Sequence, residues 1–508
     1  MALKKIRYRT EHDTLGEVKV PATALFGAQT QRAVENYPIS GIREHPSFIR
    51  AFVVIKKAAA LANFELKAID RKRAEAISNA CDEILGEGST PFRKTDFKNR
   101  AKRSSREDDL RAVASLIPEQ YISEDHREQF VVDVFQAGAG TSFNMNVNEV
   151  VANLANLSFG NKLGAYDPIH PNDHVNMSQS TNDTVPTATR IATLLLLREL
   201  FPQLDALSAA FERKGDEFAD VIKSGRTHLQ DAVPVTLGQE FHAYAAAMRR
   251  STRLLESAAN ELRDLPIGGS ATGTGINTPT GYRYSMVRHL SALTNLRLSS
   301  TADLREGMQS QLPIAAVASA LKNLALELTR ITNDLRLLAS GPLTGLAEIG
   351  LPSVQPGSSI MPGKVNPSML ECMNQLLFHI IGAESAISYA VQAGQLELNV
   401  MMPLMAYELL FSIEILKNFL PVFTQKTIDG ITADRERCEA YYVTSPSLAT
   451  ALNPVIGYEK AAKIAKESAT TRTPIPQLIR ERNLLSEKEI ARIFSPDFLA
   501  GQADRKKR

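Results

Sequence analysis

The sequence predicts a mainly α-helical protein whose centre is a bundle of long helices. From Ile314 to Leu338 the apolar residues recur at steps that alternate three and four, which is the heptad seam of a long helix packed nearly parallel to others. Similar patterns occur over residues 187–222, 241–262 and 402–423. Such long seams favour an elongated bundle and association with further copies of the chain. A single-chain bundle that satisfies every seam internally is the alternative.

Length and composition are those of an ordinary globular protein with two or three domains. The 508 residues exceed what one core usually holds. A balance of 58 Lys and Arg against 56 Asp and Glu leaves a net charge of +2, which argues against nucleic acid as the main partner. Three cysteines are too few for a disulfide framework. Neither a signal-peptide core nor an apolar run of the roughly 18 residues that span a membrane is found, so we expect a cytoplasmic protein.

In chain order, the first of the helical segments contains a proline. Pro202 interrupts the pattern of residues 187–222 and should end or kink that helix, because proline lacks the N–H donor and crowds the preceding turn. The segment 241–262 places Phe241, Tyr244, Met248 and Leu255 along one face. The segment 402–423 is a further long candidate.

A loop of small residues, "GSSIMPGKVNP" at 357–367, resembles a phosphate-binding loop but does not match one. Such a loop needs G-x-x-x-x-G-K-[ST] so that backbone N–H groups wrap the phosphates and a hydroxyl reaches the metal. Here the two glycines are too far apart, Pro362 removes a donor, and Val365 replaces the hydroxyl residue. The remaining hydroxyls, cation and amide suit an anionic ligand of another kind.

Three further polar stretches differ from ordinary connectors, because they contain much Thr, Ser, Asn and Gln but little Lys or Glu. They are "FQAGAGTSFNMNVNEVVAN" at 135–153, "HPNDHVNMSQSTNDTVPTA" at 170–188 and "SGRTHLQDAVPVTLGQE" at 224–240. Uncharged donors can crowd round a carboxylate without repelling one another. Taken singly, each stretch is also consistent with a helix cap or a turn.

Together these four blocks resemble the aspartase and class II fumarase superfamily of lyases. The similarity runs from about Arg9 to about Phe498, and "GSSIMPGKVNP" is similar to the signature loop of that family. The resemblance implies a mixed N-terminal domain, a central long-helix domain and a small helical C-terminal domain, expected here at 1–179, 180–432 and 433–508. It also implies a homotetramer whose active sites are each built from three subunits.

The chemistry of such a lyase explains the polar loops. Removing a proton from the carbon next to a carboxylate places the charge on that carboxylate as an enediolate, so many donors must be aimed at it. In the family the first serine of the signature loop is the general base, and Ser358 matches it. A serine can act in this way only where N–H groups and positive charge stabilise its alkoxide, which a glycine-rich loop beside Lys364 could supply. The two glycines also suggest a lid.

The resemblance assigns the other roles by position. The carboxylate that becomes the enediolate would be held by Thr141, Ser180, Thr181 and Ser359. The other carboxylate would be held by Thr227, Lys364 and Asn366. The leaving group would be faced by Thr141, Asn182 and His228. Glu371 matches the acidic partner of the active-site histidine. A purely structural histidine is the alternative interpretation of His228.

Within the family, "AGTSFNMN", "MSQSTND" and "GQLELNVM" favour an aspartate ammonia-lyase that converts L-aspartate to fumarate. In contrast, "LFGAQTQRAVE" and "ALNPVIGYEKAAKIAKES" are similar to fumarate hydratases, which remain the second candidate. A non-catalytic structural relative is a remote third, because the full set of catalytic residues is present. No cofactor is expected for the chemistry, and divalent-cation activation stays open.

Two other motifs do not support their first interpretation. "HPNDH" at 170–174 lacks a third clear ligand for a metal site; the resemblance instead implies a secondary anion site at His170, Asn172 and Asp173. "GGSATGTGINT" at 268–278 follows no clear strand, so a dinucleotide fingerprint is not expected, and we expect it to shape the backbone near the active site.

A basic segment at about 89–121 departs from the family pattern. We expect it to be a solvated surface loop, with an anion-attracting or partner-binding flap near the substrate entrance as the alternative. Its cations are Arg93, Lys94, Lys98, Arg100, Lys102, Arg103 and Arg106.

Overall fold

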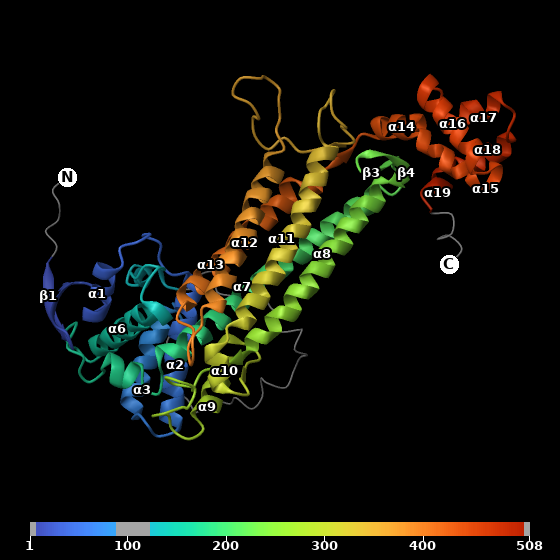
Figure 1. Cartoon of the computed structure of the whole chain (residues 1–508). Coiled ribbons are helices and arrows are strands. Elements are labelled where there is room, and N and C mark those ends of the chain that lie inside the picture. Colours follow the sequence, from blue (N-terminus) through green and yellow to red (C-terminus); the bar gives the residue numbers. More distant parts are fainter. Residues whose placement is uncertain (1–6, 88–121, 502–508) are drawn as a thin grey trace. The chain divides into compact units, whose positions relative to one another are not determined.

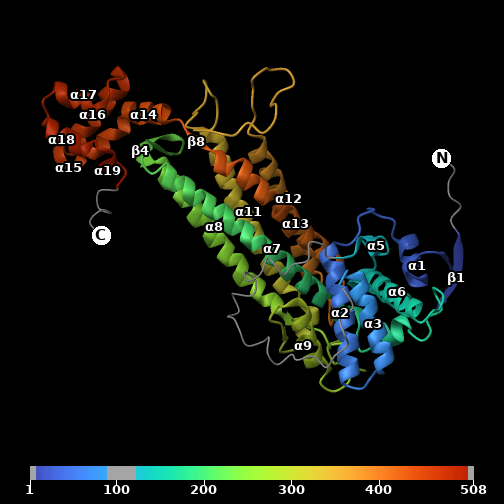
Figure 2. The ribbon, with the colours of Figure 1, turned by 180° about the vertical axis from the view of Figure 1, so that it is seen from behind.

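The computed structural model describes residues 7–87 and 122–501, so the basic segment predicted at 89–121 lies outside the described residues. Figures 1 and 2 show the course of the chain. The chain forms two compact units, each described by itself below. Unit 1 contains Met1–Pro202, Arg253–Asn323 and Phe378–Lys417, and unit 2 contains Gln203–Thr252, Leu324–Leu377 and Asn418–Arg508. The units therefore do not follow chain order, and the division at residues 179 and 432 stays a prediction.

The N-terminal part of unit 1 combines a hairpin with short and medium helices. Strands β1 (Tyr8–Asp13) and β2 (Gly16–Pro21) pair antiparallel. Helices α2, α3 and α6 pack side by side (Figure 1). Between α2 and α6, the ring of Phe143 stacks on Phe48, and Phe52 meets both rings edge to face. The helices here are α1 (Ala28–Asn36), α2 (Pro46–Glu65), α3 (Arg71–Ile84), α5 (Glu124–Arg127) and α6 (Thr141–Ser158).

Five long helices contribute residues to both units and confirm the mainly helical prediction. They are α7 (Thr181–Glu217), α8 (Leu237–Asn260), α11 (Leu312–Leu338), α12 (Ser368–Gln392) and α13 (Met402–Lys426). Helix α7 runs without interruption through Pro202, so it does not end there. Leu200, Phe201 and Leu204 are fully buried on both sides of the proline, and this packing offsets the one missing backbone hydrogen bond.

The heptad seam of α11 lies in the protein core. Val317, Leu321, Leu324, Leu328 and Ile331 are each at most 1% exposed. Among the described residues, α11 is the one helix long and apolar enough to cross a membrane by length and composition. Burial of its seam within the protein is the arrangement expected for the core helix of a bundle.

Contacts inside each unit hold the long helices together. In unit 1, Lys417 of α13 donates to Glu199 of α7 at 2.9 Å, and Glu384 of α12 accepts from Ser319 of α11 at 3.0 Å. In unit 2, the rings of Phe211 on α7 and Tyr244 on α8 meet at 5.9 Å. The seams are thus at least partly satisfied within one chain.

Short elements complete unit 1. Strands β5 (Asp264–Leu265) and β6 (Ser299–Ser300) pair in parallel. The remaining helices of this unit are η2 (Gly138–Gly140), η3 (Pro171–Val175), η4 (Glu261–Arg263), α9 (Tyr282–Thr294) and α10 (Leu304–Gln309).

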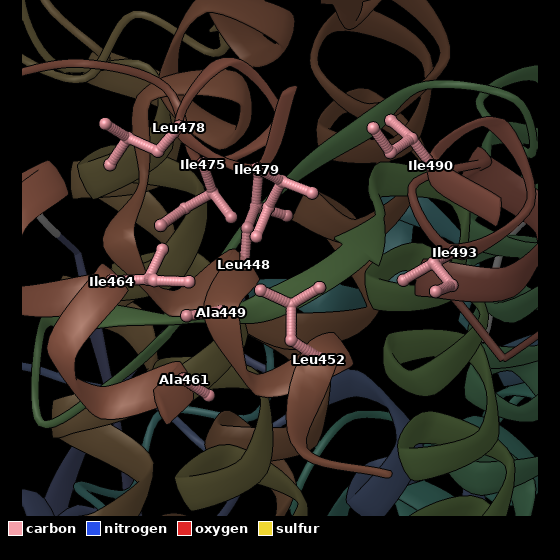
Figure 3. Packing of buried hydrophobic residues seen from close by; sticks show 10 residues of the cluster. All are labelled: Leu448, Ala449, Leu452, Ala461, Ile464, Ile475, Leu478, Ile479, Ile490 and Ile493. Carbon is pink, nitrogen blue, oxygen red and sulfur yellow. The ribbon is translucent and has the colours of Figure 1, made fainter. Parts of the chain in front are cut away.

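Unit 2 adds two small sheets and a helical C-terminal part. Strands β3 (Ile222–Thr227) and β4 (Gln230–Thr236) form a hairpin, and β7 (Ile349–Gly350) pairs antiparallel with β8 (Thr432–Ala433). Leu452, Ile475 and Ile479 are fully buried in the C-terminal core (Figure 3). The helices that build this part are η5 (Ile428–Gly430), α14 (Arg435–Thr444), η6 (Pro446–Leu452), α15 (Asn453–Ile456), α16 (Tyr458–Thr471), α17 (Ile475–Glu481), α18 (Glu487–Ile493) and α19 (Pro496–Leu499).

Candidate active site

Two of the predicted substrate-binding threonines begin helices in unit 1. Thr141 is the first residue of α6, and Thr181 is the first residue of α7. The chain turns into α6 through left-handed backbone at Ala139 (φ 63°) and Gly140 (φ 87°). Ala139 N–H donates to Val400 O at 2.7 Å, which joins the "GAGT" block to the "GQLELNVM" block. Both threonines lie where helix N–H groups favour an anion.

Ser180 caps α7 reciprocally with Asp183. The Ser180 hydroxyl accepts from Asn182 N–H at 3.2 Å, and the Asp183 carboxylate accepts from Ser180 N–H at 2.9 Å. This arrangement is similar to a capping box, but the serine hydroxyl accepts from the second helical residue, Asn182, instead of the third. It fixes Ser180, Thr181 and Asn182, three predicted site residues, in one rigid turn.

Asp183 also holds the glycine-rich loop at 268–278. Its second oxygen accepts from Gly268 N–H at 3.0 Å and from Ser270 N–H at 2.9 Å. Burial raises the pKa of Asp183 to about 6, against the lowering effect of these hydrogen bonds. Asn182 donates to Ala271 O at 2.8 Å. The contact supports the prediction that this loop shapes the backbone beside the predicted site.

Thr227 and His228 lie at the tip of the β3–β4 hairpin in unit 2. Thr227 pairs with Gln230, so His228 and Leu229 form a two-residue turn. Their φ angles are 56° and 59°, the values of a type I′ turn, which usually requires Asn or Gly. A leucine in left-handed backbone is uncommon, and its 70% exposure means that packing does not compensate.

A buried charge network anchors this hairpin. Glu348 is fully buried and accepts from both terminal nitrogens of Arg226, at 3.0 and 2.9 Å. Lys223 Nζ lies 3.0 Å from Glu348 and 2.9 Å from Glu240. Arg226 directly precedes Thr227, so the network sets the position of the hairpin tip. Neither Glu348 nor Arg226 was identified from the sequence.

The signature loop folds back on itself. Ser358 Oγ accepts from Met361 N–H at 2.9 Å and from Ile360 N–H at 3.3 Å. Asn366 donates to Gly357 O at 2.7 Å and closes the loop. A Cβ at Gly357 would lie 2.2 Å from Lys364 O, so only glycine fits there. The two N–H groups aimed at Ser358 are the kind of donor that stabilises an alkoxide.

The site residues of this loop are open to solvent or partly so. Ser359 and Lys364 are exposed, whereas Ser358 and Asn366 are half-buried. Glu371 lies in the first turn of α12, and Arg336 of α11 is 3.9 Å away from it. Within the described part of one chain Glu371 pairs with Arg336 and not with His228, so its pairing with the histidine stays a prediction.

The "HPNDH" segment forms one π-helical turn, η3, in unit 1. His170 Nδ1 accepts from Asp173 N–H at 3.3 Å, while His170 N–H donates to His174 Nδ1 at 2.9 Å. Burial and the nearby Arg73 lower the pKa of His174. The predicted secondary anion site at His170, Asn172 and Asp173 thus has a defined backbone, and its binding role stays a prediction.

Comparison with known proteins identifies the family. A family model described as "Lyase" matches residues 16–91 and 99–382, and one described as "Fumarase C C-terminus" matches residues 448–501. The chain belongs to the aspartase/fumarase superfamily of lyases. The first model covers the predicted site loops and the second covers the C-terminal helices.

The sequences of individual relatives are similar to that of this lyase along nearly its whole length. It is 44% identical to the aspartate ammonia-lyase of Corynebacterium glutamicum, over 97% of this chain and 87% of the relative. It is 42% identical to that of Escherichia coli, over 98% of both chains. Among solved structures, a cobalt-bound fumarate lyase:delta crystallin of Brucella melitensis matches with a TM-score of 0.87 at 42% identity, covering 98% of this chain and all of the other.

A class II fumarase structure from Schistosoma mansoni also matches this lyase, with a TM-score of 0.87 at 31% identity. It covers 97% of this chain and 99% of the other. These similarities confirm the predicted fold class.

The predicted site residues of this lyase fall into two groups. Unit 1 holds Thr141, Ser180, Thr181 and Asn182, whereas unit 2 holds Thr227, His228, Ser358, Ser359, Lys364, Asn366 and Glu371. Hydrogen bonds connect the predicted site residues at the start of α7 with one another. Other hydrogen bonds hold the signature loop together. Lys56, which is buried beneath the first group and bonds to it through Asn144, was not among the predicted site residues. Its signal was a pair of lysines inside the apolar run "FVVIKKAAALAN".

Two other features of this lyase lie apart from that set. No group of three His, Cys, Asp or Glu side chains in residues 7–87 and 122–501 is arranged to hold a metal ion. A groove of about 650 Å³ lies between α7 and α8, and none of the predicted site residues lines it. Its lining residues are Asp205, Ser208, Ala209, Glu212, Arg213, Asp216 and Arg249.

Proposed function

We propose that this lyase is an aspartate ammonia-lyase, which eliminates ammonia from L-aspartate to give fumarate through an enediolate, without a cofactor. The single observation that carries the mechanism is the geometry at Ser358, whose oxygen accepts two backbone N–H bonds. These donors favour the charged form of the hydroxyl. The curated relatives named aspartate ammonia-lyase support the choice of substrate.

The reaction places a general base between two carboxylate sites. Ser358 takes the proton from the carbon next to the carboxylate that becomes the enediolate. Donors at Thr141, Ser180, Thr181 and Ser359 meet the charge that develops there. Lys364, Asn366 and Thr227 bind the other carboxylate. Asn182 and His228, together with Thr141, face the departing ammonia.

We also propose a homotetramer whose active sites combine loops from three subunits. Apolar side chains exposed on the long helices support an assembly, because a soluble monomer rarely leaves such a surface uncovered. On α12, Phe378 is 57% and Tyr389 is 71% exposed, and on α11 Leu326 is 50% exposed. Within such a site, Glu371 would act on the His228 of another subunit.

Replacing the base tests the mechanism. Ser358→Ala removes the acceptor of the proton, so kcat for ammonia release should fall by about 10³-fold, within the range of general-base catalysis. The matched control is Ser353→Ala, an exposed serine in the segment that leads to the same loop. Most of the activity remaining in Ser358→Ala would refute the assignment of the base.

The leaving group needs a separate test, because a fumarate hydratase would use the same two carboxylate sites. The match of residues 448–501 to the fumarase C-terminal model keeps this second candidate open. Wild-type protein should release ammonia from L-aspartate. Interconversion of malate and fumarate without any ammonia release would refute the ammonia-lyase and favour the fumarate hydratase.

Subunit complementation tests the shared site. Ser358→Ala and Thr181→Val should each be nearly inactive, since each removes one group from every site. Mixed tetramers made by coexpression should regain part of the activity, because some sites then receive both intact residues from different subunits. A single-chain site predicts no recovery.

A further inference from the structure

Lys56 is a buried lysine in the apolar helix α2. It is fully buried, and its ammonium group donates to Asn144 at 2.7 Å, to Asn176 at 3.1 Å and to Gln179 at 3.0 Å. An ammonium group has three N–H donors and no acceptor. All three donors therefore have an oxygen acceptor.

This donor set dictates how the amide side chains are turned. Each of the three amides must present its oxygen to Lys56, so each NH₂ group points elsewhere. For Asn144, which is 1% exposed, the NH₂ group points at Thr181. The Thr181 hydroxyl can donate or accept, so without Lys56 the contact between Asn144 and Thr181 would not decide whether the oxygen or the nitrogen of Asn144 faces Thr181.

Asn144 passes this orientation to Thr181. Its NH₂ group donates to the Thr181 hydroxyl oxygen at 3.1 Å, so an acceptor site on that oxygen is occupied. Within residues 7–87 and 122–501 the Thr181 hydroxyl proton has no acceptor of its own. The proton is thus available to a ligand, and Thr181 can approach a carboxylate as a donor.

We propose that Lys56 and Asn144 are positioning residues that hold the Thr181 hydroxyl as a hydrogen-bond donor toward the carboxylate that becomes the enediolate. The inference rests on the proposed function, because Thr181 contacts that carboxylate only if the site is assembled as described. The chain of contacts Lys56, Asn144 and Thr181 is called the relay below.

The charge of Lys56 adds to this role. Burial lowers the pKa of Lys56 to about 7, while the negative charge of Asp183 on α7 opposes the shift. The neighbouring Lys57 pairs with Asp82 instead. In its charged form, which predominates below about pH 7, Lys56 lies one amide away from Thr181. It then favours the dianionic enediolate over the substrate carboxylate, since its interaction grows with the charge that develops.

A double-mutant cycle tests the relay. Asn144→Asp keeps the size of the side chain and the acceptor for Lys56, but it replaces the NH₂ donor by an oxygen. The Thr181 hydroxyl must then donate to the new carboxylate and is lost to the ligand. We expect kcat to fall roughly 100-fold, as when one oxyanion donor is removed. Thr181→Val, which removes the hydroxyl, should cost a similar factor.

The double variant decides between coupling and independent effects. If Asn144 acts through Thr181, the two changes together should cost little more than either alone. A loss equal to the product of the single losses would overturn the relay. The matched control is Asn146→Asp, a buried asparagine two residues later on α6 that donates to Gln129 O at 3.0 Å and, within the described residues, has no hydrogen bond with Lys56 or Thr181. Its effect should multiply with that of Thr181→Val.

Succinate binding separates the relay from the proposed reaction. Succinate has both carboxylates and no leaving group, so its Kd measured by calorimetry reports on the site whichever elimination is catalysed. Asn144→Asp and Thr181→Val should each weaken succinate binding, again without multiplying. If the two effects on the Kd of succinate are non-additive and the protein releases no ammonia, the relay is supported and only the assignment of aspartate as substrate is refuted. Additive values would overturn the relay.

Discussion

Removing the charge of Glu348 should strongly destabilise unit 2. Glu348→Gln keeps the shape of the side chain, but it leaves Lys223 and Arg226 with Glu240 as the one remaining acid of the network. The fully buried carboxylate accepts two hydrogen bonds from Arg226 and lies 3.0 Å from Lys223. Breaking a buried ion pair from one side costs about 3–5 kcal/mol, because the partner charge stays buried.

The chain offers a control with the same geometry at the surface. Arg435 donates to both oxygens of Asp220 at 2.9 and 3.0 Å, and the two side chains are 57% and 74% exposed. Both pairs lie in unit 2. Because solvent screens the exposed pair, Asp220→Asn should cost at most about 1 kcal/mol.

Urea unfolding followed by far-UV circular dichroism measures both costs, since the chain contains no tryptophan for fluorescence. Glu348→Gln should lower the unfolding free energy by at least about 2 kcal/mol more than Asp220→Asn. Near-equal losses would refute the view that burial makes the Glu348 network essential. Folded Glu348→Gln should also bind substrate more weakly, because Arg226 then no longer fixes Thr227.

Two further changes test the buried lysine and the signature loop. The pKa of Lys56 is about 7 in the folded protein against 10.5 ordinarily, so between these values the unfolded chain binds more protons and the contribution of Lys56 to stability rises with pH. The unfolding free energy of the wild type minus that of Lys56→Met should therefore grow by about 1.4 kcal/mol per pH unit between about pH 7 and 10. Urea titrations at several pH values measure this difference, and a difference that does not change with pH would contradict the lowered pKa. Gly357→Ala places a Cβ 2.2 Å from Lys364 O and should abolish most turnover while leaving the circular dichroism spectrum unchanged; normal kinetics would show that the loop opens freely.

Regular local patterns made much of the fold predictable. The seam from Ile314 to Leu338 predicted α11, which begins at Leu312 and ends at Leu338. The segment 402–423 corresponds to α13, which continues to Lys426. These predictions succeed because helix periodicity is a property of neighbouring residues. The continuation of α7 through Pro202 could not be predicted, since it depends on the packing of the surrounding helix face.

The candidate site was predictable only in part. Ser358 and Thr181 were predicted from motifs, because each lies in a short run of polar residues that is visible in the sequence itself. Glu348 escaped notice because its partner Arg226 is 122 positions away along the chain, and a single acid between apolar residues carries no pattern. Lys56 did carry a local signal, but its meaning depends on three amides that only the folded chain brings to it.

The starts of α6 and α7 have a consequence for how the site can evolve and be studied. Thr141 and Thr181 are the first residues of these helices, so the peptide groups behind them contribute positive partial charge that belongs to the backbone. No side-chain substitution removes that contribution. Scanning the threonines one by one will therefore underestimate how much of the anion affinity this region supplies, and a variant with both threonines replaced should still attract dicarboxylates.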